Sequence, residues 1–283
     1  MTEKAELMVA NRANHAEGPV WDPVRRVLFW VDLTGGKLFA LDPESSSMQT
    51  RAFAEPVCAV APWDDGRLLV AFAKRLAWVE WPEGDVVEIV PVEAELPGNR
   101  CNDGKRDPAG RFWIGTMSSD GAVVGAGALY RLEHDGKLTR VLGDRTIANG
   151  MGWSLDARTM YFIDSPTREV WAFDFDPADS SITNRRVVVR VPDGLGFPDG
   201  MTVDAEGMLW VAHWGAGCVC RWDSVTGSLL AMVQTGCPHT SSCAFGGRSG
   251  RDLFITTSRL GLGADALALA PDSGSLFKHR CSA

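Results

Sequence analysis

The chain has 283 residues, 45% of them hydrophobic, and its 36 Asp and Glu against 28 Lys and Arg give a net charge of −8. No basic run is longer than two residues, which excludes the electrostatic footprint expected of a nucleic-acid-binding protein. No stretch approaches the ~20 apolar residues that span a bilayer, and the first residues lack the apolar segment of a signal peptide. We therefore expect a cytoplasmic protein without nucleic-acid or membrane partners.

A pattern of about 45 residues recurs six times along the chain. Each copy opens on polar and glycine residues, passes through a turn, and continues into short runs rich in apolar and aromatic residues. The runs are VLFWVD and KLFALDP, RLLVAF and LAWVEWP, RFWIGT and ALYRLE, TMYFID and EVWAFDFDP, MLWVA and CVCRWD, and DLFITTS and SLFKHR. The turn residues follow one another at intervals of 42, 43, 49, 48 and 43 positions: Asp22, Asp64, Asp107, Asp156, Asp204 and Gly247.

These runs predict strands rather than helices, because they are short and are bounded by Asp-Gly, Gly-Gly or proline-containing turns. A period of 40–50 residues with about four strands per copy is typical of a β-propeller. We predict an all-β, six-bladed propeller with four antiparallel strands per blade, forming one domain over residues 1–283. A β-sandwich or two small barrels is the alternative, and the even spacing favours the propeller.

Two segments lie outside the regular repeat. Residues 7–10, an apolar run near the N-terminus, are expected to supply a strand to the last blade and close the ring. Residues 261–271 have helical composition and are expected to form a loop or a single turn before the last strand. The seven cysteines are odd in number and fit no zinc spacing, so we expect buried free thiols: Cys58, Cys101, Cys218, Cys220, Cys237, Cys243 and Cys281.

The repeat predicts a site, because the first strand of every blade lines the central channel and equivalent positions meet at one height. Four copies begin that strand with oxygen-bearing side chains, each followed by a glycine that permits close approach: Glu17, Asn102 with Asp103, Asn149 and Asp199. Carboxylates gathered there would repel, and a divalent cation with Asp, Glu, Asn and water as ligands would compensate them. Taken singly, Asn-Gly and Asp-Gly are also common hairpin-turn dipeptides. No histidine stands at these positions, which argues against a His-rich metal site.

Stretches over nearly the whole chain resemble the senescence-marker protein, regucalcin and gluconolactonase family. The similar residues are 17–21, 100–105, 107–108, 115–117, 127–130, 149–150, 153–154, 161–165, 198–201 and 243–247. Members of this family are six-bladed propellers that hydrolyse sugar lactones with one bound divalent metal. The resemblance implies the same fold and a metal-dependent lactonase acting on a small sugar lactone.

The resemblance also implies roles for single residues. The metal would be held by Glu17, Asn149 and Asp199, and the substrate's oxygens would be bound by Arg100 and Asn102. Asp103 would lie beside the metal, and we expect Asp199 to be the general base, with Asp103 as the second candidate. The three oxygen ligands and water accept Ca, Mg, Mn, Zn or Fe(II).

One departure from the family follows Gly115-Thr116-Met117. Where the family has acidic residues, one of which contacts substrate, this chain has Ser118-Ser119-Asp120, and Ser119 is our candidate for that contact. Trp214 either stacks on a sugar ring or packs between blades. Two other functions compete with the lactonase: a non-catalytic calcium-binding or regulatory protein, and an aryl-ester or organophosphate hydrolase on the same scaffold.

Overall fold

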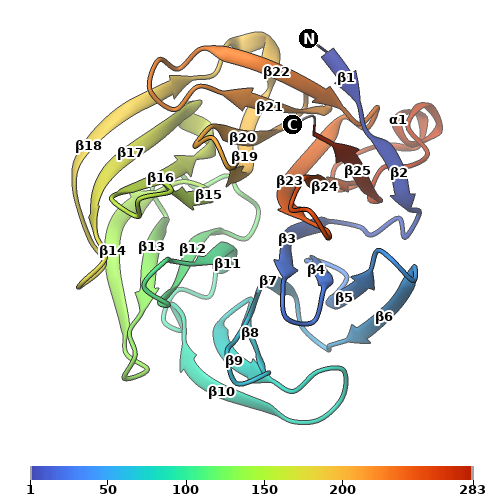
Figure 1. Ribbon diagram of the computed structural model, residues 1–283. Coiled ribbons are helices and arrows are strands. Elements are labelled where there is room, and N and C mark those ends of the chain that lie inside the picture. Colours follow the sequence, from blue (N-terminus) through green and yellow to red (C-terminus); the bar gives the residue numbers. More distant parts are fainter. Residues whose placement is uncertain (1, 282–283) are drawn as a thin grey trace.

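The computed structural model describes residues 2–281, so the predicted domain bounds at residues 1 and 283 lie outside the described residues. Figure 1 shows β-sheets arranged as blades around a central axis. Four of the sheets have four antiparallel strands each, and a nine-stranded sheet combines two further blades through a single pairing of Trp214 with His239. The predicted all-β, six-bladed propeller is confirmed.

Blades 1 to 3 follow one another along the chain, and each runs from its inner strand outward. Blade 1 contains β3 (Ala16–Asp22), β4 (Val27–Asp32), β5 (Lys37–Asp42) and β6 (Ser47–Ala52). Blade 2 contains β7 (Val57–Pro62), β8 (Leu68–Phe72), β9 (Arg75–Val79) and β10 (Val86–Pro91). Blade 3 contains β11 (Asn99–Arg106), β12 (Phe112–Ser118), β13 (Gly127–Leu132) and β14 (Leu138–Arg145).

Blades 4 to 6 complete the ring. Blade 4 contains β15 (Ala148–Trp153), β16 (Thr159–Asp164), β17 (Glu169–Asp176) and β18 (Ser181–Arg190), with the short 3-10 helix η1 (Ser165–Thr167) between β16 and β17. After η2 (Asp193–Leu195), blade 5 contains β19 (Phe197–Val203), β20 (Leu209–Trp214), β21 (Cys218–Trp222) and β22 (Leu229–Gln234). Blade 6 contains β23 (His239–Gly246), β24 (Asp252–Ser258) and β25 (Leu276–Arg280).

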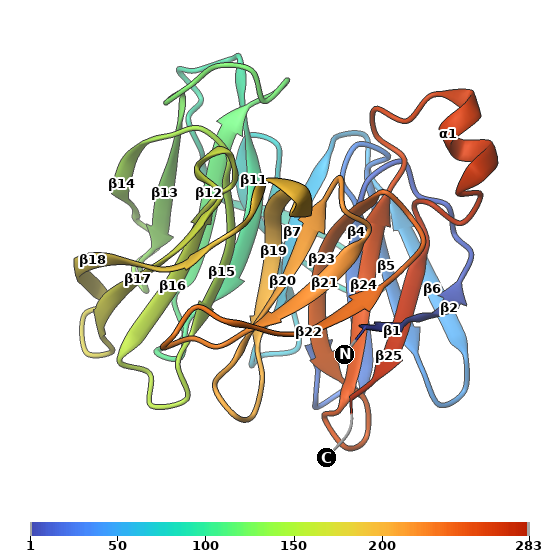
Figure 2. The same cartoon turned by 90° about the horizontal axis from the view of Figure 1, so that it is seen from above.

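The N-terminal segment closes the ring, as predicted. Strand β2 (Glu6–Val9) pairs antiparallel with β25 and becomes the outer strand of blade 6. Strand β1 (Thr2–Lys4) pairs parallel with β22 and extends blade 5, which the sequence pattern did not predict. The expected turn before the last strand is the six-residue helix α1 (Ala264–Leu269), which Figure 2 shows at one edge of the molecule. Across residues 2–281, no helix has both the length and the apolar character that crossing a membrane requires.

Burial follows the position of each strand in its blade. The second strands are enclosed by neighbouring blades and are almost entirely buried, as in VLFWVD of β4 and LLVAF of β8. The outermost strands face solvent, and SMQTRA of β6 is mostly exposed. Apolar clusters fill the spaces between adjacent blades, with Trp30 and Trp113 among the largest fully buried side chains. The continuous apolar runs of the sequence therefore mark strands covered on both faces.

The repeated aspartate ends the inner strand of a blade and stabilises the turn that follows. Asp204 Oδ1 accepts hydrogen bonds from the backbone N–H groups of Glu206 and Met208, both at 2.9 Å. Asp22 and Asp107 accept backbone N–H groups of their own turns in the same way. A carboxylate that satisfies turn N–H groups explains why Asp recurs at the spacing of the blades.

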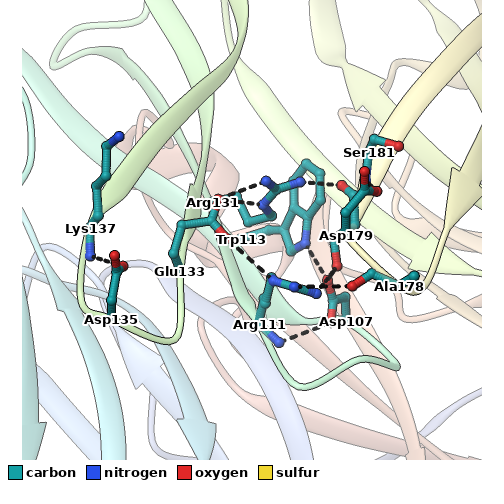
Figure 3. Close-up of polar contacts among 11 residues, drawn as sticks. Asp107, Arg111, Trp113, Arg131, Glu133, Asp135, Lys137, Ala178, Asp179 and Ser181 are labelled. Atoms are coloured by element: carbon teal, nitrogen blue, oxygen red, sulfur yellow. Dashed lines mark hydrogen bonds and ion pairs between the residues drawn. The ribbon is translucent and has the colours of Figure 1, made fainter.

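A cluster of polar side chains, drawn in Figure 3, joins blades 3 and 4. We call it the inter-blade network and define it as Asp107, Arg111, Trp113, Arg131, Glu133 and Ser180. Asp107 Oδ2 accepts hydrogen bonds from Trp113 Nε1 at 2.8 Å and from Ser180 Oγ at 2.7 Å. Glu133 forms ion pairs with Arg131 at 2.7 Å and with Arg111 at 3.3 Å. Every carboxylate of the network therefore has cationic or N–H and O–H partners.

Candidate functional site

All six inner strands change register at the same height of the channel. The shift lies between residues 17 and 20 in β3, 57 and 59 in β7, 101 and 104 in β11, 149 and 151 in β15, 198 and 201 in β19, and 240 and 242 in β23. A β-bulge re-aims side chains and occurs often beside functional sites. A ring of bulges around the axis is therefore a structural mark of the site.

Glycines let the inner strands approach one another at this height. A Cβ on Gly150 would lie 2.4 Å from the backbone oxygen of Asp199, and one on Gly200 would lie 2.1 Å from Ser242 Oγ. Gly18 has a φ of 53°, in the left-handed region that glycine adopts most readily. The predicted need for glycine after the polar residues is confirmed at these positions.

Two cavities open along the inner strands. The upper cavity, about 450 Å³, is bordered by the starts of these strands, and the lower cavity, about 820 Å³, is bordered by their ends. The upper cavity contains six of the seven predicted site residues: Glu17, Arg100, Asn102, Ser119, Asn149 and Asp199. The seventh, Asp103, lines the lower cavity together with Lys105. The repeat therefore brings the predicted residues together, with Asp103 on the other side of the ring of bulges.

Three buried carboxylates meet at the axis, and we call Glu17, Asp103 and Asp199 the axial cluster. Burial raises the pKa of Glu17 well above its usual value, and the charges of Asp199 and Asp103 raise it further. The pKa of Asp199 is raised well above its usual value by burial and by Asp103, although Asn149 opposes this. Burial also raises the pKa of Asp103, against the opposing effect of Lys105. No Lys or Arg side chain in residues 2–281 forms a salt bridge with any member of the axial cluster.

Hydrogen bonds orient Asn149 and Asp199 toward one point. Asn149 Nδ2 donates to Ser165 Oγ at 3.1 Å and to Asp199 Oδ1. Both amide protons of Asn149 therefore have acceptors, and its Oδ1 is left to bind a ligand. Glu17 Oε2 accepts the backbone N–H of Gly18 at 2.9 Å, which fixes the side chain beside its own strand.

The donor set fits a divalent cation. Two carboxylates and an amide oxygen are hard ligands, and both carboxylates are buried with no salt bridge to a described residue, although the charge of Arg100 partly opposes the rise in their pKa values. In the part of the chain that the structure describes, no three His, Cys, Asp or Glu side chains are grouped closely enough to hold a metal by themselves. The set presented here therefore depends on the Asn149 oxygen and on water to complete the coordination.

Arg100 and Asn102 form a polar wall of the upper cavity. Arg100 Nη1 donates to Asn102 Oδ1 at 2.8 Å and to the backbone oxygen of Cys101 at 2.9 Å. Asn102 Nδ2 donates to the backbone oxygen of Ala148 at 3.1 Å, so the amide links blades 3 and 4. These bonds hold a half-buried cation at the cavity, where a carbonyl or hydroxyl oxygen of a ligand can accept from it.

The loop after β12 contributes Ser119 and also Asp120, both exposed and both on the upper cavity. Trp214 lies in the wall of the upper cavity and its ring stacks on that of His239, with the ring centroids 4.0 Å apart, so whether it also stacks on a sugar ring stays a prediction. His213 lies elsewhere: it is fully buried, and its Nδ1 contacts the backbone oxygen of Leu195 at 2.8 Å.

Sequence reasoning placed Arg100 at the site but did not recognise the layer of the cavity to which it belongs. Side chains two residues apart on a strand point to the same side, so the residue two positions before each proposed ligand also faces the channel. We call this layer the upper ring, and its members all line the upper cavity: His15, Arg100, Ile147 and Phe197. Counting back two residues from each ligand would have found it.

Comparisons with known proteins show the family to which the chain belongs. A family model described as the SMP-30/gluconolactonase/LRE-like region matches residues 15–259. The chain belongs to this family. It is 39% identical to regucalcin of Danio rerio over 277 residues, which cover 97% of this chain and 93% of that protein.

Solved structures of the family are also similar to this chain. A calcium-binding protein, regucalcin, from Agrobacterium tumefaciens is 30% identical, with a TM-score of 0.93 over 98% of this chain and 94% of that one. A gluconolactonase from Xanthomonas campestris is 26% identical, with a TM-score of 0.75 over 97% of this chain and 89% of that one. The resemblance drawn from the sequence is thereby confirmed at the level of family, while the roles of single residues stay predictions.

Proposed function

We propose that this member of the family hydrolyses a sugar lactone to its aldonic acid and that the reaction depends on one divalent cation. One observation carries the proposal: two buried carboxylates that form no salt bridge with any described residue share a cavity with a free amide oxygen and with Arg100. The similarity to a gluconolactonase supports the reaction class, and the similarity to a calcium-binding regucalcin supports a hard cation.

Glu17, Asn149 and Asp199 would hold the cation, which supplies Lewis-acid polarisation of a carbonyl oxygen when bound. Arg100 and Asn102 would orient the lactone, because the guanidinium can donate to substrate oxygens while Asn102 keeps it in place. Positioning of this kind reduces the entropy cost of bringing water and ester together.

Asp199 is the proposed general base. Its Oδ1 is engaged by Asn149, so Oδ2 is left to take a proton from the attacking water. The oxygen of that water adds to the carbonyl carbon, the bond from this carbon to the ring oxygen breaks, and the ring oxygen receives the proton that Asp199 took from the water. Asp103 lines the lower cavity, and its proposed role is to raise the pKa of Asp199 through the repulsion between the two carboxylates.

A calcium-binding protein without catalysis is the second candidate function, and the calcium-binding relative favours it. Arg100 discriminates between the two candidates. A site that only stores a cation gains nothing from a second positive charge beside it, whereas a lactonase uses that charge to bind substrate oxygens.

The proposal is tested by assaying glucono-, xylono- and arabinolactone with purified protein, before and after chelation and after single cations are added back. We expect at least one of these lactones to be hydrolysed, with activity lost on chelation and restored by a divalent cation. Turnover of none of them, combined with tight binding of a cation, would instead establish the non-catalytic function.

A further inference from the structure

His15, a member of the upper ring, is held in one orientation by its surroundings. Its backbone N–H donates to Asp32 Oδ1 at 3.0 Å, and its Nδ1 contacts Ser258 Oγ at 3.0 Å. The indole of Trp214 packs against the imidazole with centroids 5.5 Å apart and planes at 83°. The side chain is buried, with 6% of its surface exposed, so these contacts fix the ring.

The contacts of Ser258 bear on which ring nitrogen of His15 carries the proton. Ser258 Oγ accepts the backbone N–H of Leu260 at 3.0 Å and lies 3.2 Å from the backbone oxygen of Asn14. Ser258 Oγ can direct its proton to the backbone oxygen of Asn14, which also accepts the backbone N–H of Arg259 at 3.0 Å, and in that arrangement Nδ1–H of His15 is the donor to Ser258. No carboxylate among residues 2–281 pairs with His15, so the imidazole is neutral and Nε2 has a lone pair.

Nε2 of His15 faces the upper cavity. This atom has no hydrogen-bond partner among the described residues. The described polar side-chain atoms that are both fully buried and without a hydrogen-bond partner are Arg111 Nε, Trp153 Nε1, Ser273 Oγ and Ser275 Oγ, and His15 Nε2 is not among them. It therefore remains accessible, and the cavity is the space that His15 borders. The lining of this cavity includes the apolar side chains of Phe197, Trp214 and Leu260, and Trp214 packs directly against His15. A lone acceptor in such a wall selects for a donor on the ligand.

We propose that His15 Nε2 accepts a hydrogen bond from a hydroxyl group of the substrate and thereby selects hydroxylated lactones over lactones without hydroxyl groups. Arg100, also in the upper ring, donates to substrate oxygens, so the ring of side chains above the axial cluster presents both a donor and an acceptor. A hydroxyl supplies an acceptor and a donor at once, which matches this pair. The inference rests on the proposed lactonase function and names its substrate class.

Two substitutions distinguish the loss of the Nε2 acceptor from the loss of the other contacts of His15. The amide of His15→Asn occupies the place of Nδ1, so it keeps a donor for Ser258 and removes the acceptor in the cavity. The longer side chain of His15→Gln reaches the place of Nε2 and keeps an acceptor there. Thermal unfolding of both variants is measured first, so that kinetic effects are assigned to folded protein.

The substrates are glucono-1,5-lactone and δ-valerolactone, which has the same ring without hydroxyl groups. We expect His15→Asn to lower kcat/KM for gluconolactone about tenfold, mainly through KM, and to leave δ-valerolactone unchanged. His15→Gln is expected to stay within about threefold of the wild type on both. Equal losses on the two lactones, or no loss on gluconolactone, would overturn the inference.

A binding measurement keeps the inference testable apart from turnover. The probe is 1,5-anhydroglucitol, a polyhydroxylated ring without a carbonyl, titrated calorimetrically into cation-loaded protein. We expect His15→Asn to weaken its binding about tenfold and His15→Gln to preserve it. If the wild type hydrolyses no lactone but shows this pattern, the proposed reaction fails and the hydroxyl contact stands. Failure of the wild type to bind the probe, or equal binding by wild type and His15→Asn, overturns the hydroxyl contact.

Discussion

The inter-blade network and the axial cluster both bury carboxylates, but they differ in what surrounds them. In the network, Glu133 is paired with Arg131 and Arg111, and Asp107 accepts from Trp113 and Ser180 (Figure 3). Burial acts to raise the pKa of Glu133, yet hydrogen bonds from Arg131 and Thr139 bring it below its usual value.

In the axial cluster, burial and mutual repulsion prevail, and the pKa values of Glu17 and Asp199 are raised. A buried charge without compensation costs several kcal/mol, so a protein retains such a group only where something else stabilises it. The comparison teaches that the network stabilises the fold by itself, whereas the axial cluster lacks such partners, and the proposed cation would supply the missing positive charge.

The largest effect is expected from Asp199→Asn, which removes the proposed base and one ligand. Activity on a lactone should fall about 10²–10⁴-fold, because general base catalysis contributes that much. The chelated protein should keep its fold and unfold at the same or a higher temperature, since a buried unpaired charge is gone. Steady-state kinetics and thermal unfolding measure both effects. A variant that keeps most of its kcat would refute the role of Asp199.

Asp107→Ala tests the other side of the comparison. It leaves Trp113 Nε1 and Ser180 Oγ without their acceptor, and each unsatisfied buried donor costs about 1–3 kcal/mol. We expect the free energy of unfolding to fall by about 3 kcal/mol in denaturant titrations. The folded variant should retain wild-type kcat/KM. A loss below about 0.5 kcal/mol would show that the network does not stabilise the fold as argued.

Adding a divalent cation should stabilise the wild type by about 2.7 kcal/mol at a hundred times its dissociation constant. The ion binds the folded axial cluster and has no such site in the unfolded chain. Glu17→Gln should show little of this gain, whereas Asp107→Ala should keep all of it. Thermal unfolding with and without chelator provides the measurement, and equal stabilisation of wild type and Glu17→Gln would place the ion elsewhere.

The smallest effect concerns pH. A raised native pKa means that Glu17 and Asp199 contribute stability below their unfolded values, near pH 4, and lose it as pH rises through the native pKa. Glu133 has the opposite sign: its lowered pKa gives stability above its unfolded value that is lost as pH falls.

Chelated wild type should therefore lose stability between pH 5 and pH 8 relative to a Glu17→Gln, Asp199→Asn variant, in which both charges are absent. Denaturant unfolding at the two pH values measures the difference, and a saturating cation should abolish it. Parallel pH dependence of the chelated wild type and the variant would mean that these carboxylates are compensated by groups other than an ion.

Much of the fold could be predicted because each copy of the repeat contains the same kinds of turn and strand residues. The turn aspartates and the apolar runs recur with the blades, and residues 7–10 form the apolar run expected of a closing strand. Strand β1 could not be predicted, since Thr2–Lys4 is a short polar segment that pairs only because β22 presents a free edge. The edge exists only after the blades have formed.

The site could be predicted in part for the same reason. Equivalent positions of the repeat identified Glu17, Asn149 and Asp199, and the structure brings them to one cavity. The placement of Asp103 in the lower cavity depends on a bulge after Cys101, and no residue type at this position predicts that bulge. From the sequence alone His15 is interpreted as a polar loop residue, because the side chains that surround it, Ser258 and Trp214, lie far away in the sequence.

The central claim is that Glu17, Asn149 and Asp199 hold a divalent cation, and the most direct test is to count the ions. Chelated protein is dialysed to equilibrium against Ca, Mg, Mn, Zn or Fe(II) and analysed for bound metal. The account predicts one tightly bound ion per wild-type chain for at least one of these cations, and none for Glu17→Gln, Asp199→Asn. A wild type that binds none of them, or a double variant that still binds one, would contradict it.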